Sequence, residues 1–311
     1  MKAFTEYLAS KKFTKSGIAS RLTMIKLYLK WLKEAQLEAT EIGYIDLLLY
    51  MKYCGNRGAS QKTIQQYIGT IKHYYDYLKA AKEIKANPVV GIEVKGIKRK
   101  TLYHILEVEE LHKLYEAHQI NQRHQPINQR NKVMVGLLVY QGLNTKELAQ
   151  LEVKDIDLQA AKVTIYGGIK SNGRAITLKA NQLMDLYHYI ETAREKLLQM
   201  KPKRKTQIRT ATDKLIVVAG GNYQNFGNLM TRLMIKLSKQ NKSVLNAKQA
   251  CLSVRQIRAS VITHWLKQYN LREVQYLAGH RYISSTESYF ENDLEGLQEE
   301  VNLYHPLDYE A

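Results

Sequence analysis

The apolar residues of positions 1 to 80 recur at helical spacing, and this pattern stops at Asn87-Pro88. Proline cannot continue the interior of a helix and disfavours the helical conformation of the residue before it. The segments with helical spacing are Ile18 to Leu32, Tyr44 to Tyr53 and Ile64 to Leu78, the last of them behind Ser60, a favourable N-cap. The sequence therefore predicts a small, all-helical N-terminal domain.

A basic segment without an apolar face follows the proline. Residues 93 to 100 read Glu-Val-Lys-Gly-Ile-Lys-Arg-Lys, a composition typical of a linker. We expect a helical domain at residues 1–92, a basic linker at 93–105, a larger domain at 106–292 and a C-terminal tail at 293–311.

The larger domain has a mixed pattern. Helical spacing begins near Leu111 and returns in a buried segment over Val133 to Tyr140. Two alternating segments, Val163 to Tyr166 and Ala175 to Leu178, flank a glycine-containing turn and predict a hairpin. A long amphipathic helix is predicted over Leu183 to Met200. The expected fold class is mainly α with a small β-hairpin or sheet.

The charge balance points to an anionic partner. Lys and Arg number 47 against 29 for Asp and Glu, which gives a formal net charge of +18 and a pI near 9.6. Nucleic acid is the partner that such an excess favours. No apolar run is long enough to span a membrane, so no membrane partner is expected.

The cysteines and the N-terminus indicate the compartment. Cys54 and Cys251 lie far apart without a CxxC motif, which suggests neither a zinc site nor a disulfide framework. Residues 1–6 lead into a charged amphipathic stretch instead of the apolar core of a signal peptide. We expect a cytoplasmic protein.

Two groups of basic residues are candidates for contacts with a DNA backbone. The candidates are Lys62, Lys72 and Lys79 on the last N-terminal helix, and Lys98, Arg99 and Lys100 in the linker. A basic linker could lie along DNA while the domains clamp the duplex from opposite sides. A solvated helix face and an ordinary interdomain linker would explain the same residues.

Side chains that can bind and attack a phosphate occur in order near the C-terminus. Arg255 and Arg258 are three apart in a helical pattern and should share one face, where guanidinium groups can hold phosphate oxygens. His280 follows in Leu277-Ala-Gly-His280, and Tyr289 lies nine positions on. A phenol has a pKa near 10, so a site that uses it as nucleophile must supply cations. Ser284 to Glu287 reads as a capping box that begins a helix with Tyr289 in its second turn.

This order of motifs resembles the tyrosine recombinases of the phage integrase family. Ile257 to Leu266 is similar to the family's second-arginine motif, and Val274 to His280 with Thr286 to Tyr289 is similar to its Leu-Gly-His and tyrosine motifs. Gly142 to Leu148 is similar to its first-arginine box. The resemblance covers nearly the whole chain. It implies a helical core-binding domain followed by an α+β catalytic domain.

The resemblance implies a site-specific DNA recombinase that works through a 3′-phosphotyrosyl intermediate without metal, cofactor or ATP. Tyr289 would attack the scissile phosphate, while Arg258, Arg255 and His280 would stabilise the charge on its nonbridging oxygens. Lys170 matches the family's lysine that protonates the departing 5′ oxygen. Arginines would replace the metal clamp of nucleases.

Two positions depart from the family pattern. Asn144 stands where the family places its first catalytic arginine, and Arg255 stands where a histidine or lysine is usual. Loss of one cation should cost about 10²- to 10³-fold in rate, by analogy with a lost oxyanion donor. Our hypothesis is that Arg174, on the far side of the hairpin, or Arg255 supplies the missing charge.

The resemblance also implies assembly on double-stranded DNA. Exchange between two duplexes needs four active sites, so a homotetramer on DNA is expected. The acidic tail would pack on a neighbouring subunit, as in the family, or fold back on its own domain. Two other functions stay open, namely a catalytically weakened DNA-binding accessory protein of the same fold, which Asn144 would suit, and a strand-relaxing enzyme like the type IB topoisomerases.

Overall fold

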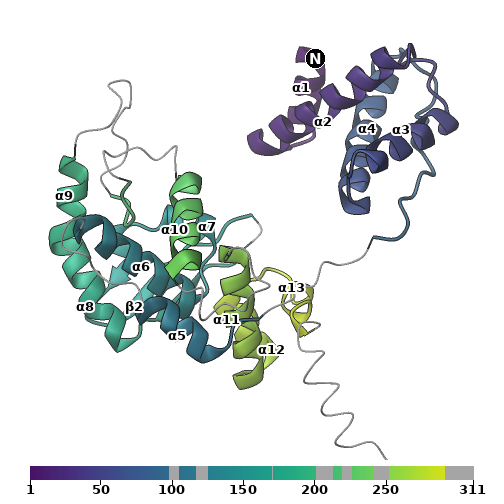
Figure 1. Cartoon of the computed structure of the whole chain (residues 1–311). Helices are drawn as coiled ribbons and strands as arrows, with labels where there is room; N and C mark the ends of the chain where they lie inside the picture. Colours follow the sequence, from purple (N-terminus) through teal and green to yellow (C-terminus); the bar gives the residue numbers. More distant parts are fainter. Residues whose placement is uncertain are drawn as a thin grey trace, which may run out of the picture. The chain divides into compact units, whose positions relative to one another are not determined.

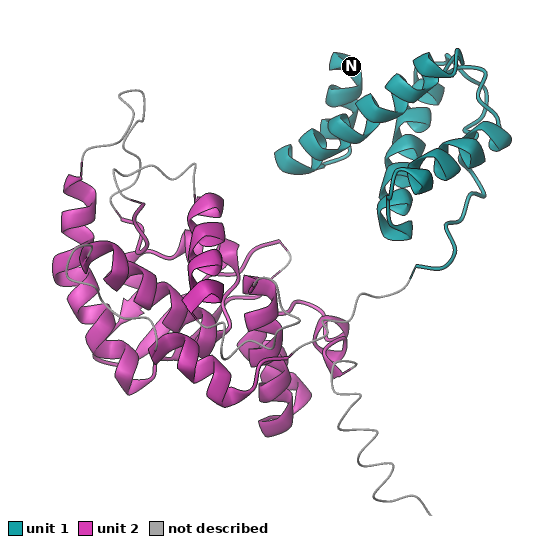
Figure 2. Ribbon diagram, in the orientation of Figure 1, with its two compact units in different colours: residues 1–100 teal, residues 101–311 magenta. Residues whose placement is uncertain are grey.

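The chain divides into two compact units, Met1–Lys100 and Thr101–Ala311 (Figures 1 and 2). The computed structural model describes residues 1–97, 105–116, 125–169, 171–200, 213–218, 226–240 and 252–290. Within these ranges, no helix is both long and apolar enough to cross a bilayer.

The described part of unit 1 consists of four helices and their connections. They are α1 (Lys2–Ser10), α2 (Lys15–Glu34), α3 (Tyr44–Asn56) and α4 (Gln61–Ala80). The Ser60 side chain accepts a hydrogen bond from the Thr63 backbone at 3.2 Å, so the predicted N-cap of α4 is confirmed. The helical character of this region is therefore set by local signals that the sequence shows.

Tyrosines form much of the core of unit 1. The hydroxyls of Tyr28 on α2 and Tyr75 on α4 are 2.7 Å apart, and both side chains are buried. Burial raises the pKa of both phenols, so each stays neutral and the pair joins the two longest helices of the unit. After α4, the Asn87 amide donates to the Asp76 carboxylate at 2.7 Å. The segment that breaks the helical pattern is thereby attached to the end of α4.

Unit 2 combines helices with a small antiparallel sheet. Its elements are α5 (Val108–Glu116), α6 (Gln125–Gln141), α7 (Thr145–Gln150), η2 (Val153–Asp155), β1 (Ile156–Asp157), β2 (Lys162–Ile165), β3 (Arg174–Thr177), α8 (Ala180–His188), η3 (Tyr189–Ala193), α9 (Arg194–Gln199), α10 (Phe226–Gln240), α11 (Val254–Gln268), α12 (Leu271–Ala278) and α13 (Ser284–Glu287). The predicted hairpin is confirmed as β2 and β3, antiparallel with Val163 opposite Ile176. The sequence pattern missed β1, a strand of two residues that pairs with β2. The helix expected over 183–200 is α8 and α9 joined by the π-helical turn η3.

The central element of unit 2 is α6, which is buried on most of its surface and packs against α5, α8 and α11. Apolar residues from Val133 to Val139 place it in the core. Because α6 ends inside the domain, the chain turns there at Gly142 and continues directly into α7. This turn brings the start of α7 beside α11.

Candidate active site

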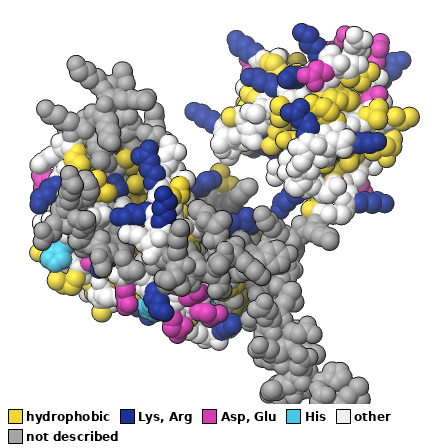
Figure 3. Space-filling model, in the orientation of Figure 1, with side chains coloured by type: hydrophobic (Ala, Val, Ile, Leu, Met, Phe, Trp, Pro, Cys, Tyr) yellow, Lys and Arg dark blue, Asp and Glu magenta, His cyan; other side chains and the backbone are white. Residues whose placement is uncertain are grey.

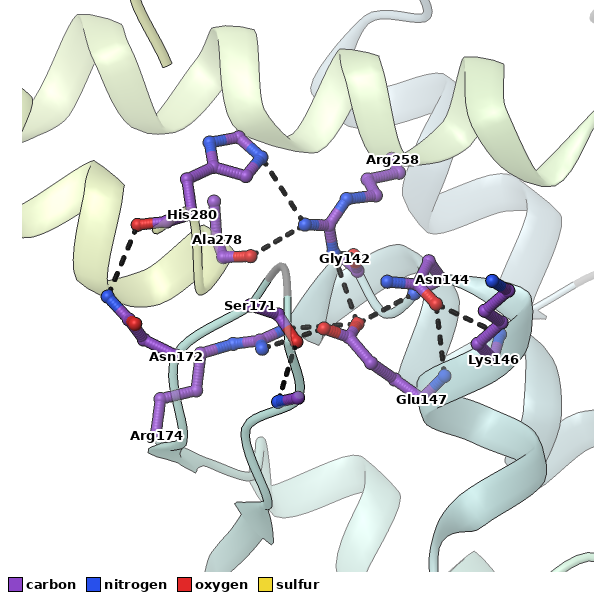
Figure 4. A network of polar contacts seen from close by, with 11 residues as sticks. Gly142, Asn144, Lys146, Glu147, Ser171, Asn172, Arg174, Arg258, Ala278 and His280 are labelled. Atoms are coloured by element: carbon purple, nitrogen blue, oxygen red, sulfur yellow. Dashed lines mark hydrogen bonds and ion pairs between the residues drawn. The ribbon is translucent and has the colours of Figure 1, made fainter. Parts of the chain in front are cut away.

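Four segments that are distant in sequence meet at one place in unit 2 (Figure 4). They are the turn from α6 into α7, the β2–β3 hairpin, helix α11, and the end of α12 with the chain that follows it. The side chain of Arg258, on α11, has hydrogen-bond partners in two of the other three segments. We therefore describe the site outward from this arginine.

Arg258 is held by the backbone of two segments. Its Nη1 donates to the Gly142 carbonyl at 2.5 Å, and its Nη2 donates to the Ala278 carbonyl at 2.6 Å. Two longer contacts complete the set, 3.3 Å from Nη1 to Glu147 and 3.5 Å from Nη2 to Nε2 of His280. Burial lowers the pKa of this guanidinium, while the charge of Glu147 opposes the shift. The side chain is 11% exposed, so it is fixed in place and still reachable.

The Glu147 carboxylate lies between two arginines. Arg174 on β3 binds it with both terminal nitrogens, at 2.8 and 3.1 Å, and Arg258 approaches one of its oxygens (Figure 4). Burial alone would raise the pKa of Glu147, but the hydrogen bonds and charges of the two arginines outweigh it and lower the pKa. Two positive groups and one negative group leave a net positive charge at this point.

Arg174 is close to the site but closed off from solvent. Its side chain is 0% exposed, and its guanidinium is occupied by Glu147. Gly279 covers it, because a Cβ at this position would lie 2.2 Å from Nη1 of Arg174. Gly279 also has φ +65, a conformation that glycine adopts without strain. In this arrangement Arg174 acts on the site through Glu147 and through its electric field.

Asn144, at the position where the family pattern has an arginine, caps the N-terminus of helix α7. Its side-chain oxygen accepts hydrogen bonds from the backbone of Lys146 at 2.9 Å and of Glu147 at 3.0 Å, and Glu147 accepts one from the Asn144 backbone. This is a capping box, which satisfies amides that the first turn of a helix leaves unpaired. The residue at position 144 therefore stabilises the start of α7 and adds no charge.

His280 is neutral at physiological pH. Burial, followed by the charges of Arg258 and Arg174, lowers its pKa to about 4. Its Nδ1 lies 2.9 Å from the hydroxyl of Thr286, a residue that is 0% exposed. Its Nε2 faces the Arg258 guanidinium. The imidazole is thus held between a hydroxyl and a cation.

Tyr289 lies beside His280 and Arg258. Its ring is stacked on that of His280, with the ring centroids 5.8 Å apart and an interplanar angle of 11°. The Tyr289 phenol is close enough to the Arg258 guanidinium to raise its pKa, against the lowering by burial. The ring is half-buried against a small apolar cluster that includes Ile262. The Tyr289 phenol therefore lies in the electrostatic field of a fixed cation, as a tyrosine nucleophile requires.

The expected helical position of Tyr289 is wrong. Helix α13 ends at Glu287, so Tyr289 follows it instead of lying in its second turn. Ser284 is not an N-cap either, because the cap residue is Ile283, which has helical backbone angles. The carbonyls of Tyr282 and Ile283 already accept backbone hydrogen bonds, so the turn starts earlier than the capping signal indicates.

The tip of the β2–β3 hairpin is attached to the loop that carries His280. The Asn172 backbone donates to the Gly279 carbonyl at 3.0 Å, and Arg281 donates to the Ile169 carbonyl at 2.8 Å. Lys170, expected to be the proton donor, lies between these anchored residues but is itself outside the described residues.

None of the remaining sequence candidates that the structure describes takes part in this network. Arg255 is exposed on the first turn of α11 and forms no hydrogen bond or ion pair with other described residues. Three candidates for DNA contacts, Lys62, Lys72 and Lys79, are exposed on α4. The three basic candidates of the linker, Lys98, Arg99 and Lys100, lie outside the described residues, as does the tail from residue 291 onward.

Two residues of the site were not selected from the sequence. Glu147 could have been found as the third residue after Asn144, since this spacing is that of a capping box. Thr286 gave no local signal of its contact with His280. Across the described ranges, no group of three or more His, Cys, Asp or Glu side chains is suited to a metal ion.

Comparison with known proteins identifies this arrangement. Residues 104–295 match the model of the phage integrase family, and residues 1–82 match the phage integrase N-terminal SAM-like domain. Tyrosine recombinase XerD of Staphylococcus aureus (strain Mu50) is 30% identical over 312 residues, which cover 97% of each chain.

Solved structures of low sequence identity share the fold. A XerH site-specific recombinase in a post-cleavage complex with a palindromic difH substrate has a TM-score of 0.71 at 21% identity, with 93% of this chain and 80% of that chain covered. A lambda integrase tetramer bound to a Holliday junction has a TM-score of 0.65 at 14% identity, with 92% and 74% covered. The chain belongs to the phage integrase family.

Proposed function

We propose that Tyr289 is the nucleophile with which this enzyme, a site-specific tyrosine recombinase, cuts and rejoins DNA strands. The observation that carries the proposal is the convergence of the Tyr289 hydroxyl, Arg258 and His280 at one half-buried place. The phenol oxygen attacks the scissile phosphorus, the bond to the 5′ oxygen breaks, and a 3′-phosphotyrosyl link forms. A 5′ hydroxyl of a partner strand then attacks this link.

Arg258 is the principal cation of the reaction. Its bonds to the Gly142 and Ala278 carbonyls are short and fix the guanidinium before DNA binds. Its contacts with Glu147 and His280 are long, so phosphate oxygens can replace them at little cost. Preorganised donors of this kind stabilise charge that develops in the transition state.

His280 acts as the proton acceptor for Tyr289. Its low pKa keeps the imidazole neutral, and Nε2 carries the lone pair because it faces the Arg258 guanidinium, which can only donate. The Tyr289 ring is stacked on this imidazole. A bound phosphate adds negative charge beside the two arginines that lower the pKa, and so it raises the affinity of Nε2 for a proton. This assignment replaces the expected charge-stabilising role of His280 with acid–base catalysis.

Lys170 donates the proton that the departing 5′ oxygen takes up. The anchoring of residues 169 and 172 to the loop of His280 supports this role, since it attaches the hairpin tip to the active-site loop. The reaction therefore transfers two protons, one from Tyr289 to His280 and one from Lys170 to the leaving 5′ oxygen.

Arg255 is the residue that best replaces the cation missing at position 144. Both terminal nitrogens of Arg174 bind Glu147 and its side chain is enclosed, whereas Arg255 is exposed one helical turn before Arg258 on α11. An exposed guanidinium can turn toward a phosphate that binds at Arg258.

DNA binding involves both units. The proposed core-binding domain, residues 1–92, presents Lys62, Lys72 and Lys79 on α4, and Figure 3 shows Lys and Arg side chains scattered over the visible face of unit 1. The basic residues of the linker, Lys98, Arg99 and Lys100, add contacts with DNA phosphates. Exchange between two duplexes cuts four strands with one Tyr289 per protomer, so a homotetramer is the active assembly. The lambda integrase tetramer with the same fold supports this stoichiometry.

The test is covalent capture on DNA. A target duplex is first recovered by selection from random sequences and then nicked near the cleavage point, so that the cut strand cannot be rejoined. We expect a protein–DNA adduct on the 3′-phosphate side with the wild-type chain and none with Tyr289→Phe. Tyr282→Phe is the matched control, because this tyrosine of the same loop is 66% exposed and its removal should leave the adduct intact.

Other outcomes identify the competing functions. A bound duplex without adduct would contradict the role of Tyr289 and favour the accessory protein. Relaxation of a supercoiled plasmid with a single site, without exchange between two sites, would favour the topoisomerase.

A further inference from the structure

The buried hydroxyl of Thr286 contacts one of the two ring nitrogens of His280 and so favours one of the two neutral tautomers of the imidazole. Thr286 lies on α13, with its backbone N–H bonded to the Ile283 carbonyl at 2.7 Å, and its hydroxyl is 2.9 Å from Nδ1 of His280. The residue is 0% exposed, so water does not compete for this contact. The hydroxyl is therefore a fixed partner for one ring nitrogen.

The other ring nitrogen faces a group that can only donate. Nη2 of Arg258 is 3.5 Å from Nε2 of His280, and a guanidinium has no acceptor atom. A proton on Nε2 would place two donors against each other, so Nε2 carries the lone pair. Nδ1 then carries the proton and donates it to the Thr286 oxygen.

We propose that Thr286 is a positioning residue that holds His280 in the tautomer with its proton on Nδ1, and so keeps Nε2 free to accept the proton of Tyr289. The proposal rests on the function proposed above for His280. In the reaction, the phenol oxygen bonds to phosphorus as its proton moves to Nε2, and the Nδ1 proton stays on the ring. The hydroxyl then stabilises the imidazolium by accepting the same hydrogen bond.

Three charged groups from other elements act on His280 as well. Arg258 on α11 and Arg174 on β3 oppose its protonation, and Glu147 on α7 favours it. These groups are the same whether or not residue 286 has a hydroxyl. A change confined to this hydroxyl therefore isolates its effect on the tautomer and on basicity.

The first measurement uses the unaltered protein and no DNA. Nitrogen-15 NMR of labelled histidine at pH 7 distinguishes a protonated Nδ1 from a protonated Nε2. We expect His280, assigned by comparison with His280→Gln, to show a protonated Nδ1. A protonated Nε2 would overturn the proposal whatever the enzyme does with DNA.

The second measurement is single-turnover cleavage across pH. Thr286→Val keeps the shape but removes the acceptor, so we expect the cleavage rate to fall about five- to tenfold, the worth of one hydrogen bond. The acidic limb of the pH profile should move to lower pH, because the imidazolium loses its acceptor, while DNA affinity stays unchanged. Thr286→Ser should restore both rate and profile.

Thr263 provides the control for loss of a buried threonine hydroxyl. It is also buried in unit 2, and its hydroxyl has no hydrogen-bond partner in the described structure. Thr263→Val should leave the cleavage rate and its pH profile unchanged.

Two outcomes would refute the positioning role of Thr286. One is a Thr286→Val protein with the wild-type cleavage rate and pH profile, and the other is a Thr286→Ser protein as slow as Thr286→Val. Failure of Tyr289→Phe to abolish the adduct would instead refute the proposed function, with the NMR result unaffected.

Discussion

Removal of the Glu147 carboxylate should strongly destabilise unit 2. This carboxylate is 7% exposed and neutralises Arg174, whose side chain is 0% exposed, while it also contacts Arg258. Glu147→Ala leaves a buried guanidinium without a counter-charge, which typically costs about 3–5 kcal/mol. That is a large part of the stability of an ordinary domain, about 5–15 kcal/mol.

The expected change is measurable by thermal unfolding. A domain of this size shifts its midpoint by about 2–4 °C per kcal/mol, so Glu147→Ala should lower the midpoint of unit 2 by roughly 6–20 °C at pH 7. The difference from wild type should shrink with acid. Because the folded pKa of Glu147 is lowered, its stabilisation is present above the unfolded value of 4.5 and is lost as pH falls through the folded value.

Glu152 is a matched control for this carboxylate. It also binds two cations, Lys154 at 2.8 Å and Lys214 at 2.9 Å, but its side chain is 27% exposed. Water can solvate the two lysines when this carboxylate is removed, so Glu152→Ala should leave the midpoint of thermal unfolding almost unchanged.

A double variant tests whether the uncompensated charge of Arg174 is the cause of the destabilisation. Glu147→Ala with Arg174→Met removes the buried charge together with its partner, and this protein should be more stable than the single variant. If the free energy of unfolding of Glu147→Ala is within about 1 kcal/mol of wild type, or if the double variant is no more stable than the single one, then Arg174 does not need Glu147 as a buried counter-charge.

Two further predictions concern charge at the site. Asn144→Arg should lower stability by about 1 kcal/mol through loss of the cap and leave the single-turnover cleavage rate almost unchanged, because Arg255 already supplies the missing charge; Asn144→Ala should lose the cap in the same way. A rise of about 10²-fold in Asn144→Arg would contradict the role proposed for Arg255. His280 binds a proton near pH 6.5 when unfolded and near pH 4 when folded, so the free energy of unfolding should fall as pH drops through this window. Denaturant titrations at a series of pH values should show a smaller fall for His280→Gln, and an equal fall would contradict the low pKa.

Local signals in the sequence determined most of the secondary structure. The cap at Ser60, the hairpin and the helical spacing of α2, α4 and α11 depend on residues within a few positions of each other, so they could be predicted without the fold. The ordered motifs likewise identified Arg258, His280 and Tyr289 as one set. The local signals were insufficient where a cap competed with earlier backbone bonds, as at Ser284.

Tertiary structure alone decided what each charged group can do. Arg174 was a candidate cation by sequence, but its partner Glu147 is 27 positions away, and that contact encloses it. Arg258 meets Glu147 across 111 positions, and the neutrality of His280 comes from burial beside these groups. Chemical identity is a property of the sequence, whereas solvation and the nearest counter-charge depend on which distant segments pack together.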